Sequence, residues 1–169
     1  LCILPLHHVH GIVNVVCCSL WAGATCTFMP SFDSTAIFSL FSQQILTVFM
    51  AVPTIYYKLI SHWEQLDTAQ QSSLKKSMQA FRLMVSGSAA LPVSVMEKWE
   101  QISGHRLLER YGMTEIGMAI SNPLHGERRA GYIGVPLPGV SVQLVDDQFA
   151  PVSVGEPGQV LVKGQTVFS

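Results

Sequence analysis

The sequence predicts an α/β fold in which a parallel sheet is flanked by helices and followed by an antiparallel β segment. Through residue 125, short apolar runs alternate with segments of helical periodicity, a pattern typical of parallel sheets covered by helices. From residue 126 onward, glycine, proline and short alternating runs dominate, which indicates antiparallel β structure. We therefore interpret residues 1–125 as the α/β part and residues 126–169 as the β-rich part of one incomplete, truncated domain.

The first 32 residues carry no Asp, Glu, Lys or Arg, and their apolar runs predict buried elements. We expect a short strand or irregular segment at residues 1–6, a buried helix at 11–20 and a buried strand at 25–29. Because residues 11–29 are long and apolar enough to suggest a membrane span, that alternative stays open. Polar side chains interrupt this stretch and no basic residue flanks it, so we expect no membrane span.

Local signals mark the boundaries of the helices that follow. Asp33 is an N-cap candidate before an apolar helical face, and Pro53 takes a favoured first-turn position in the next helix. Residues 65–76 are polar and predict a surface helix or loop. Pro92 begins the last helix and Gly104 ends it.

Apolar runs between these helices predict the strands of the parallel sheet at residues 46–50, 81–85 and 106–108. Runs at residues 140–145 and 159–163 predict the antiparallel strands. Ligands of open α/β sheets bind beyond the carboxyl ends of the strands. The loops that follow the parallel strands are therefore the expected location of a functional site.

Composition argues against some classes of protein. The chain has 169 residues, of which 49% are hydrophobic and 12% charged, and so low a charge content is typical of a segment covered by other parts of a larger protein. The formal net charge of −1 and the lack of a Lys/Arg cluster argue against a nucleic-acid partner. Both ends lie beside apolar runs, so we expect missing N-terminal and C-terminal parts of the same polypeptide. The four cysteines are interpreted as reduced, buried thiols.

The least generic segment is residues 109–115, Glu-Arg-Tyr-Gly-Met-Thr-Glu, which follows a predicted strand. Gly112 lets a ligand approach the backbone, and Tyr111 offers a flat face for stacking. Thr114 offers a hydroxyl group, and Glu115 a hard oxygen ligand suited to Mg²⁺. An alternative interpretation is a turn that leads into a helix with Thr114 as its N-cap.

Residues 111–115, Tyr-Gly-Met-Thr-Glu, resemble a hallmark of the adenylate-forming (AMP-binding) enzymes, which include acyl-CoA synthetases, luciferases and peptide-synthetase adenylation domains. Residues 4–11 resemble the family's proline–aromatic–histidine segment, and residues 86–92 resemble its small-residue nucleotide loop. Residues 134–139 and 155–160 resemble later family segments. Because these matches follow the family order over nearly the whole chain, the chain is identified as an internal part of the large N-terminal domain of an acyl-CoA synthetase.

The resemblance implies an acid–thiol ligase reaction in two steps. A carboxylic acid first reacts with ATP to give an acyl-adenylate and pyrophosphate, and the thiol of coenzyme A then displaces AMP. A small carboxylic acid, ATP and coenzyme A are thus the implied small-molecule partners, with Mg²⁺ as cofactor. The first step brings two anions together, so charge neutralisation by Mg²⁺ and cationic groups is expected to dominate catalysis.

The resemblance also implies roles for single residues. Glu115 would hold Mg²⁺ near the phosphates, Thr114 would bind the α-phosphate, and His8 would lie near the acyl carboxylate. These three are the implied catalytic residues. Tyr111 would pack against adenine. The implied nucleotide-binding set is Gly87, Ser88, Ala89, Glu109, Tyr111, Gly112, Met113 and Thr114.

Arg110 bears on the choice of substrate, because many family members carry a small or uncharged residue there. A guanidinium is always ionised and holds a carboxylate through two parallel hydrogen bonds, which suits a dicarboxylic acid rather than an apolar chain. The resemblance implies that His10 and Ser86 also face the substrate, and the combination resembles malonyl-CoA synthetases, which activate malonate or methylmalonate. Two alternatives stay open: an ion pair of Arg110 with Glu109 or Glu115, and a core histidine at His10 that the backbone satisfies.

Other interpretations stay open as well. His7, His8 and His10 with Cys2 or Cys17 form a candidate zinc site, although their spacing matches no standard pattern. The chain is alternatively a non-catalytic truncated relative that binds nucleotide or a partner, or part of a synthetase for a monocarboxylic fatty acid. The family's glycine-rich phosphate loop and catalytic lysine do not occur in these residues, so we expect the segment alone to be inactive. A mitochondrial location and a role in fatty acid metabolism are implied by the resemblance only.

Overall fold

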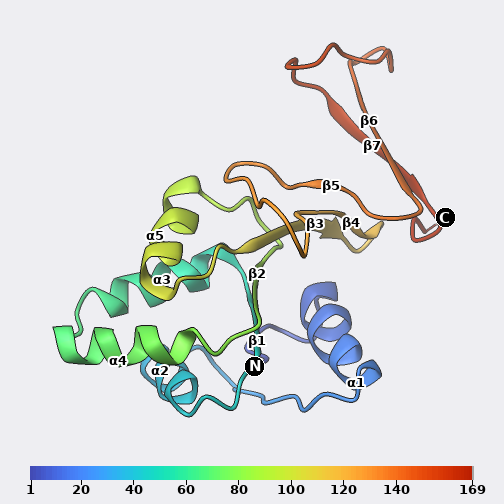
Figure 1. Ribbon diagram of the computed structural model, residues 1–169. Coiled ribbons are helices and arrows are strands. Elements are labelled where there is room, and N and C mark those ends of the chain that lie inside the picture. The colour runs from blue at the N-terminus through green and yellow to red at the C-terminus, as the bar shows by residue number, and fades with distance from the viewer. Residues whose placement is uncertain (169) are drawn as a thin grey trace.

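The computed structural model describes residues 1–168. A five-stranded sheet with the order β1-β2-β3-β4-β5 forms the centre, and β6 and β7 form a separate two-stranded sheet (Figure 1). β1 to β3 pair in parallel, whereas β3 to β5 pair antiparallel. The predicted α/β class is confirmed, but antiparallel pairing begins at β4, before residue 126. The strands are β1 Val48–Ala51, β2 Leu83–Ser86, β3 Leu108–Met113, β4 Gly117–Ser121, β5 Val135–Pro136, β6 Val140–Val145 and β7 Gln159–Gly164.

Two groups of helices cover opposite faces of the sheet. The helices are the π-helix η1 His10–Cys17, α1 Cys18–Trp21, α2 Ser34–Ser42, α3 Pro53–Trp63, α4 Thr68–Met78 and α5 Val93–Ser103. Along β1, Phe49 and Ala51 lie in the large core with α2 to α5, whereas Met50 packs in a smaller cluster with Val15 of η1. This strand alternation places α2 to α5 on one face and η1 on the other, as Figure 1 shows.

Helix boundaries follow the predicted local signals. The Asp33 side chain accepts a hydrogen bond of 2.9 Å from a first-turn amide of α2, and Pro53 begins α3. Asp67 and Gln70 form a capping box, so the polar stretch predicted as a helix or loop is a helix. Gly104 ends α5 in a left-handed conformation with φ of 77°.

A chain of aromatic rings connects the helices to the sheet. Phe41, Phe49, Tyr56 and Trp99 are fully buried and make successive edge-to-face contacts, with ring centroids 5.1, 5.7 and 5.0 Å apart. Edge-to-face pairs of this kind each contribute about 0.5–1.5 kcal/mol beyond the burial of their area. The Tyr56 hydroxyl also donates a hydrogen bond of 2.8 Å to the carbonyl oxygen of Val85, which ties α3 to β2.

The helix predicted at residues 11–20 is present, but it is buried on one face only. Trp21, at the end of α1, is 95% exposed, and Leu20 is 64% exposed. The buried members of η1 are His10, Gly11, Asn14 and Val15. No helix within the described residues is long and apolar enough to cross a membrane.

The strand predicted at residues 25–29 is wrong, because only a single bridge between Cys2 and Phe28 forms there. The prediction that all four cysteines are buried is also wrong, since Cys17 and Cys18 are exposed. All four are free thiols. An apolar run without regularly spaced polar residues gives no information on which face packs against the core, which explains both errors.

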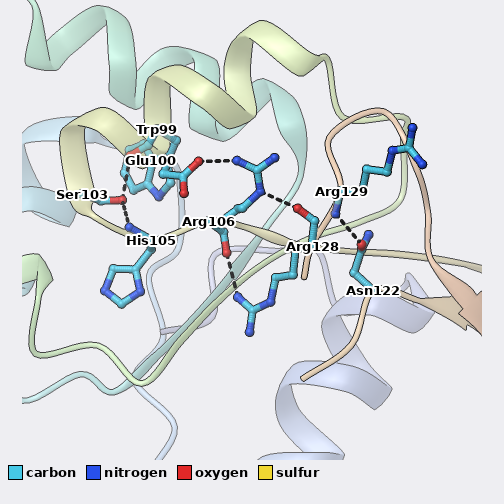
Figure 2. Close-up of polar contacts among 8 residues, drawn as sticks. All are labelled: Trp99, Glu100, Ser103, His105, Arg106, Asn122, Arg128 and Arg129. Atoms are coloured by element: carbon cyan, nitrogen blue, oxygen red, sulfur yellow. Dashed lines mark hydrogen bonds and ion pairs between the residues drawn. The ribbon is translucent and has the colours of Figure 1, made fainter. Parts of the chain in front are cut away.

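A polar network fixes the start of β3 and the loop after β4 to the end of α5 (Figure 2). Arg106 pairs with Glu100 and donates to the carbonyl oxygen of Arg128. Arg128 in turn donates from Nη1 to the carbonyl oxygen of Arg106 at 2.7 Å. Asn122 Oδ1 accepts a hydrogen bond of 3.2 Å from the Arg129 amide. These contacts hold the strand that carries the residues of the candidate site.

The β6–β7 hairpin projects from the sheet, and its base lies next to the β3–β4 hairpin (Figure 1). Val140, Val142 and Val162 contact the apolar cluster that contains Ile116 and Ile120. Since β5 pairs with β4, residues after 126 also extend the central sheet. The division of the chain at residues 125 and 126 stays a prediction.

Candidate functional site

A cavity of about 540 Å³ lies where the carboxyl ends of the parallel strands meet the start of η1. The loop after β2 and the turn between β3 and β4 form its other walls. Polar side chains from all three parts line it: His8, His10, Ser88, Thr114 and Glu115. The cavity occupies the position in which open α/β sheets bind their ligands.

The turn between β3 and β4 carries Thr114 and Glu115, whose exposed side chains line the cavity. The Ile116 amide donates to the carbonyl oxygen of Met113 at 3.3 Å and closes the turn. The side chain of Ile116 is buried behind it. No helix follows Thr114, because β4 begins at Gly117, so the interpretation of Thr114 as an N-cap is wrong. The turn presents one hydroxyl and one carboxylate to a ligand.

The loop after β2 is held in an uncommon backbone conformation. Ser88 has φ of 68°, a left-handed value that non-glycine residues rarely adopt and that is concentrated at functional sites. Glu109 is 3% exposed, and its Oε1 accepts a hydrogen bond of 2.8 Å from the Leu91 amide. Burial raises the pKa of Glu109, and this hydrogen bond opposes the rise. The Glu109 side chain therefore supports the loop, and its contact with a nucleotide stays a prediction.

His10 contacts the same loop. Its Nδ1 lies 2.9 Å from Ser88 Oγ, while its Nε2 is buried without a partner among residues 1–168, so a core histidine satisfied by the backbone is wrong. Burial, and to a smaller extent the charge of Arg110, lower the pKa of His10 to about 4. His10 is therefore neutral near pH 7. When Ser88 donates to Nδ1, the proton of the neutral ring resides on Nε2, which then becomes a hydrogen-bond donor.

Arg110 lies against Gly87 beside His10, and its Nη2 contacts Met50 Sδ at 3.2 Å. The ion pairs found in residues 1–168 do not include Arg110, so the predicted alternative of a pair with Glu109 or Glu115 is wrong. Burial lowers the pKa of Arg110, but the ordinary value of a guanidinium is so high that the group stays charged. Arg110 is thus a partly buried cation that has no carboxylate partner within residues 1–168.

Four buried side-chain atoms lack a hydrogen-bond partner within the described part of the chain. They are His10 Nε2, Asn14 Nδ2, Ser86 Oγ and Arg110 Nε. They come from η1, β2 and β3, and of these the side chains of His10 and Arg110 both lie beside Gly87. An unsatisfied buried polar atom costs about 1–3 kcal/mol, so two such atoms side by side favour a ligand that satisfies them.

The cavity brings together about half of the predicted site residues. Those that line it are His8, His10, Ser88, Gly112, Met113, Thr114 and Glu115. Those that lie outside its lining are Ser86, Gly87, Ala89, Glu109, Arg110 and Tyr111. Tyr111 packs against the apolar cluster behind the turn, so its contact with adenine stays a prediction.

Asn14 is a buried polar residue that the sequence interpretation did not single out, and it lies outside the lining of this cavity. It is 6% exposed, and it follows His10 by four residues on η1. A polar residue within an otherwise apolar stretch, one helical turn from a candidate histidine, is the signal that points to it.

A protein-only metal centre finds no support in residues 1–168, where no group of three or more His, Cys, Asp or Glu side chains is placed to hold an ion. The zinc interpretation required His10, whose Nδ1 contacts Ser88 instead. Glu115 is a single exposed carboxylate at the cavity. This arrangement fits Mg²⁺, which typically keeps several waters and binds through one or two carboxylates together with substrate phosphates.

We expect His10 to make the protein less stable in acid. Its pKa is lowered to about 4 in the folded state, so below pH 6.5 the unfolded chain takes up a proton that the folded chain does not. The free energy of unfolding should fall from pH 7 to pH 4 by roughly 2–3 kcal/mol through this residue alone. Urea denaturation across this range measures the effect.

The variant His10→Gln is the matched control, because glutamine keeps a polar side chain but does not titrate. As the pH falls from 7 to 4, the free energy of unfolding should decrease more for the wild type than for His10→Gln. Parallel stability curves for the two proteins would contradict the prediction.

The fold and the cavity define the class of protein: an α/β ligand-binding domain whose site lies at the carboxyl ends of parallel strands, next to a Tyr-Gly-Met-Thr-Glu turn. The chain belongs to the AMP-binding enzyme family, whose model matches residues 1–169. The family resemblance of the sequence motifs is thereby confirmed.

Comparison with known proteins supports this assignment. The chain is 47% identical to the mitochondrial malonate–CoA ligase ACSF3 of Xenopus laevis, over 98% of this chain and 33% of the relative. It also resembles ATP-bound MatB of Rhodopseudomonas palustris, with a TM-score of 0.86 and 37% identity over 98% of this chain and 31% of that one. A malonyl-CoA ligase complex with methylmalonyl-CoA and AMP gives a TM-score of 0.84 and 36% identity, over 98% and 34% of the two chains. The chain thus spans about a third of the length of these relatives.

Proposed function

We propose that the full-length polypeptide that carries this segment is an acid–thiol ligase that activates malonate or methylmalonate with ATP and transfers the acyl group to coenzyme A. The observation that carries the proposal is the partly buried Arg110 guanidinium, which has no acidic partner in residues 1–168 and lies beside Gly87 together with His10, whose Nε2 is buried and unsatisfied. The likeness to malonate–CoA ligases supports the same substrate class.

The second carboxylate of a dicarboxylic acid supplies what this cluster lacks. Its oxygens accept hydrogen bonds from Arg110 Nε and from the neutral Nε2–H of His10. A carboxylate and a guanidinium removed from water together satisfy each other, whereas either alone is costly to bury. Asn14 Nδ2 is a further donor on the same side of the sheet. A monocarboxylic fatty acid would leave these groups unpaired, which argues against that alternative.

The reacting carboxylate lies toward the cavity, next to His8. Its oxygen attacks the α-phosphorus of ATP and pyrophosphate leaves, and the coenzyme A thiolate then attacks the acyl carbonyl and AMP leaves. Thr114 donates its hydroxyl to the α-phosphate, and Glu115 holds Mg²⁺ by one carboxylate. Bound Mg²⁺ supplies charge neutralisation on the phosphates. Ser88 and Gly87 keep the loop close to the nucleotide.

A panel of acids tests this proposal. Full-length protein is incubated with ATP, Mg²⁺ and one acid at a time, and pyrophosphate release is followed. Propionate is the matched comparison for malonate, because it has the same number of carbon atoms but only one carboxylate. We expect kcat/KM for malonate to exceed that for propionate at least about 10³-fold, since a site built to pair a polar group rejects an analogue that lacks it. Equal values for the two acids would contradict the dicarboxylate assignment.

We also propose that the full-length protein resides in mitochondria, as the name of the Xenopus laevis relative states for that protein. Subcellular fractionation with an antibody against this segment tests the location. Recovery of the protein outside the mitochondrial fraction would contradict it.

A further inference from the structure

We infer that the segment after β7 positions the catalytic turn, and that Thr166 is the residue that fixes it. This inference rests on the proposed ligase function for its kinetic readout, but it arises from contacts to the backbone of the turn that do not involve a substrate. The segment consists of residues 165–168, which follow the base of the β6–β7 hairpin.

Two successive carbonyl groups of the turn are bound by this segment. The Thr166 hydroxyl donates a hydrogen bond of 2.7 Å to the carbonyl oxygen of Ile116. The Phe168 amide donates one of 3.1 Å to the carbonyl oxygen of Glu115. The two contacts join residues 50 and more positions apart in the sequence, so the backbone that carries the Glu115 carboxylate is held from outside the β3–β4 hairpin.

The side chain of Thr166 also packs against the turn. An added Cβ on Gly117, whose φ is 62°, would lie 3.5 Å from Thr166 Cβ. Behind the turn, the buried Ile116 side chain joins the cluster that Val162 of β7 covers. The turn is therefore held by an apolar contact on its inner side and by hydrogen bonds to Thr166 and Phe168, which leaves the Thr114 and Glu115 side chains directed to the cavity.

Fixing these carbonyls restricts the turn that must place Thr114 and Glu115 against the phosphates. Displacements of about 1 Å in such positioning elements reduce rates as much as 100-fold. The hydrogen bond of Thr166 is formed by a side chain, so it can be removed without changing the backbone. The amide of Phe168 remains in any such variant, and the expected effect is therefore smaller than the loss of a catalytic group.

The test uses two substitutions in the full-length protein. Thr166→Val has nearly the same shape but no donor, and Thr166→Ser keeps the donor. We expect Thr166→Val to lower kcat/KM for ATP about tenfold. We expect Thr166→Ser to stay within about twofold of the wild type, and the KM for malonate to stay unchanged in both, because the Arg110 side of the site is not involved. Thr35→Val, which removes a threonine hydroxyl on α2 far from the cavity, is the matched control.

The outcomes separate this inference from a purely structural role and from the proposed function. Wild-type kinetics in Thr166→Val, or an equal loss in Thr166→Ser, would overturn it. The inference would also be overturned if kcat/KM for ATP, for malonate and for coenzyme A all fell by the same factor in Thr166→Val, in proportion to a loss of folded protein. Binding of ATP and Mg²⁺ by calorimetry provides a readout that does not need turnover. If the wild type binds ATP but activates no acid, the proposed function fails while a weaker ATP affinity of Thr166→Val still supports the positioning role.

Discussion

Replacement of Arg110 by methionine is expected to lower kcat/KM for malonate about 10²–10³-fold, the loss typical of removing one partner of a buried, hydrogen-bonded charge pair. Methionine keeps much of the length of the side chain but has neither charge nor donor. The activity with propionate should stay the same or rise, because that acid has no group to pair with Arg110. Pyrophosphate release with both acids, compared between the variant and the wild type, measures the change in selectivity.

Stability distinguishes a substrate-binding arginine from a structural one. In residues 1–168 the Arg110 guanidinium forms no ion pair, so its removal takes away an uncompensated buried charge. The free energy of unfolding of Arg110→Met should therefore stay equal or rise by about 1 kcal/mol. Arg110→Lys should recover part of the malonate activity, since it restores the charge but not the planar fork. A loss of several kcal/mol together with parallel losses for both acids would contradict the assignment.

A second arginine provides the negative control. Arg129 lies on the exposed loop after β4, where its guanidinium stacks 4.0 Å from the centroid of the Tyr132 ring. Arg129→Met removes the same charge from the protein without touching the cavity, so malonate kinetics should not change. If Arg129→Met and Arg110→Met had equal effects, the loss would reflect overall charge rather than a subsite.

Helices that carry their own stop and start signals were predictable from the sequence. Asp33, Pro53 and Gly104 act on the backbone within one turn, so their effect does not depend on the rest of the fold. The helix after Asp67 is a partial case, because its polar stretch fits both a surface helix and a loop, and the capping box of Asp67 and Gln70 decides for the helix. The strand β4 was missed because the turn before it consists of Thr-Glu-Ile, which lacks the asparagine or glycine pair of a tight hairpin.

The candidate site was predictable as a set of residues but not as a geometry. The contact between His10 and Ser88 joins residues 78 positions apart, and the contact of Glu109 with the Leu91 amide, which supports the loop, joins residues 18 positions apart. Neither follows from spacing along the chain. The burial of the Asn14 amide without a partner within residues 1–168 likewise depends on the tertiary fold.

The substitution Gly112→Ala is expected to have the largest structural effect in the site. A Cβ at this position would collide with the carbonyl oxygen of Gly117 and with Met118 Cε, and would lie 3.0 Å from Met118 Cα. Two of these neighbours are backbone atoms of the paired strand, at the irregular step between Tyr111 and Gly112 in the β3–β4 register, so they move only if the hairpin opens. We expect the free energy of unfolding to fall by about 3 kcal/mol. Thermal or urea denaturation of the variant measures it.

Gly104→Ala separates the collision from the general effect of losing a glycine. Gly104 has φ of 77°, and nothing lies within 4 Å of an added Cβ, so alanine there meets only the cost of a left-handed backbone, about 1–2 kcal/mol. Gly112 adopts no such conformation, and its cost arises from the close approach of β4 alone. Because Thr114 and Glu115 lie only two and three residues after Gly112, opening the hairpin at Gly112 should also lower ATP-dependent activity of the protein that remains folded, whereas Gly104→Ala should not. If Gly112→Ala lowered the free energy of unfolding no more than Gly104→Ala does, β3 and β4 would not approach each other this closely.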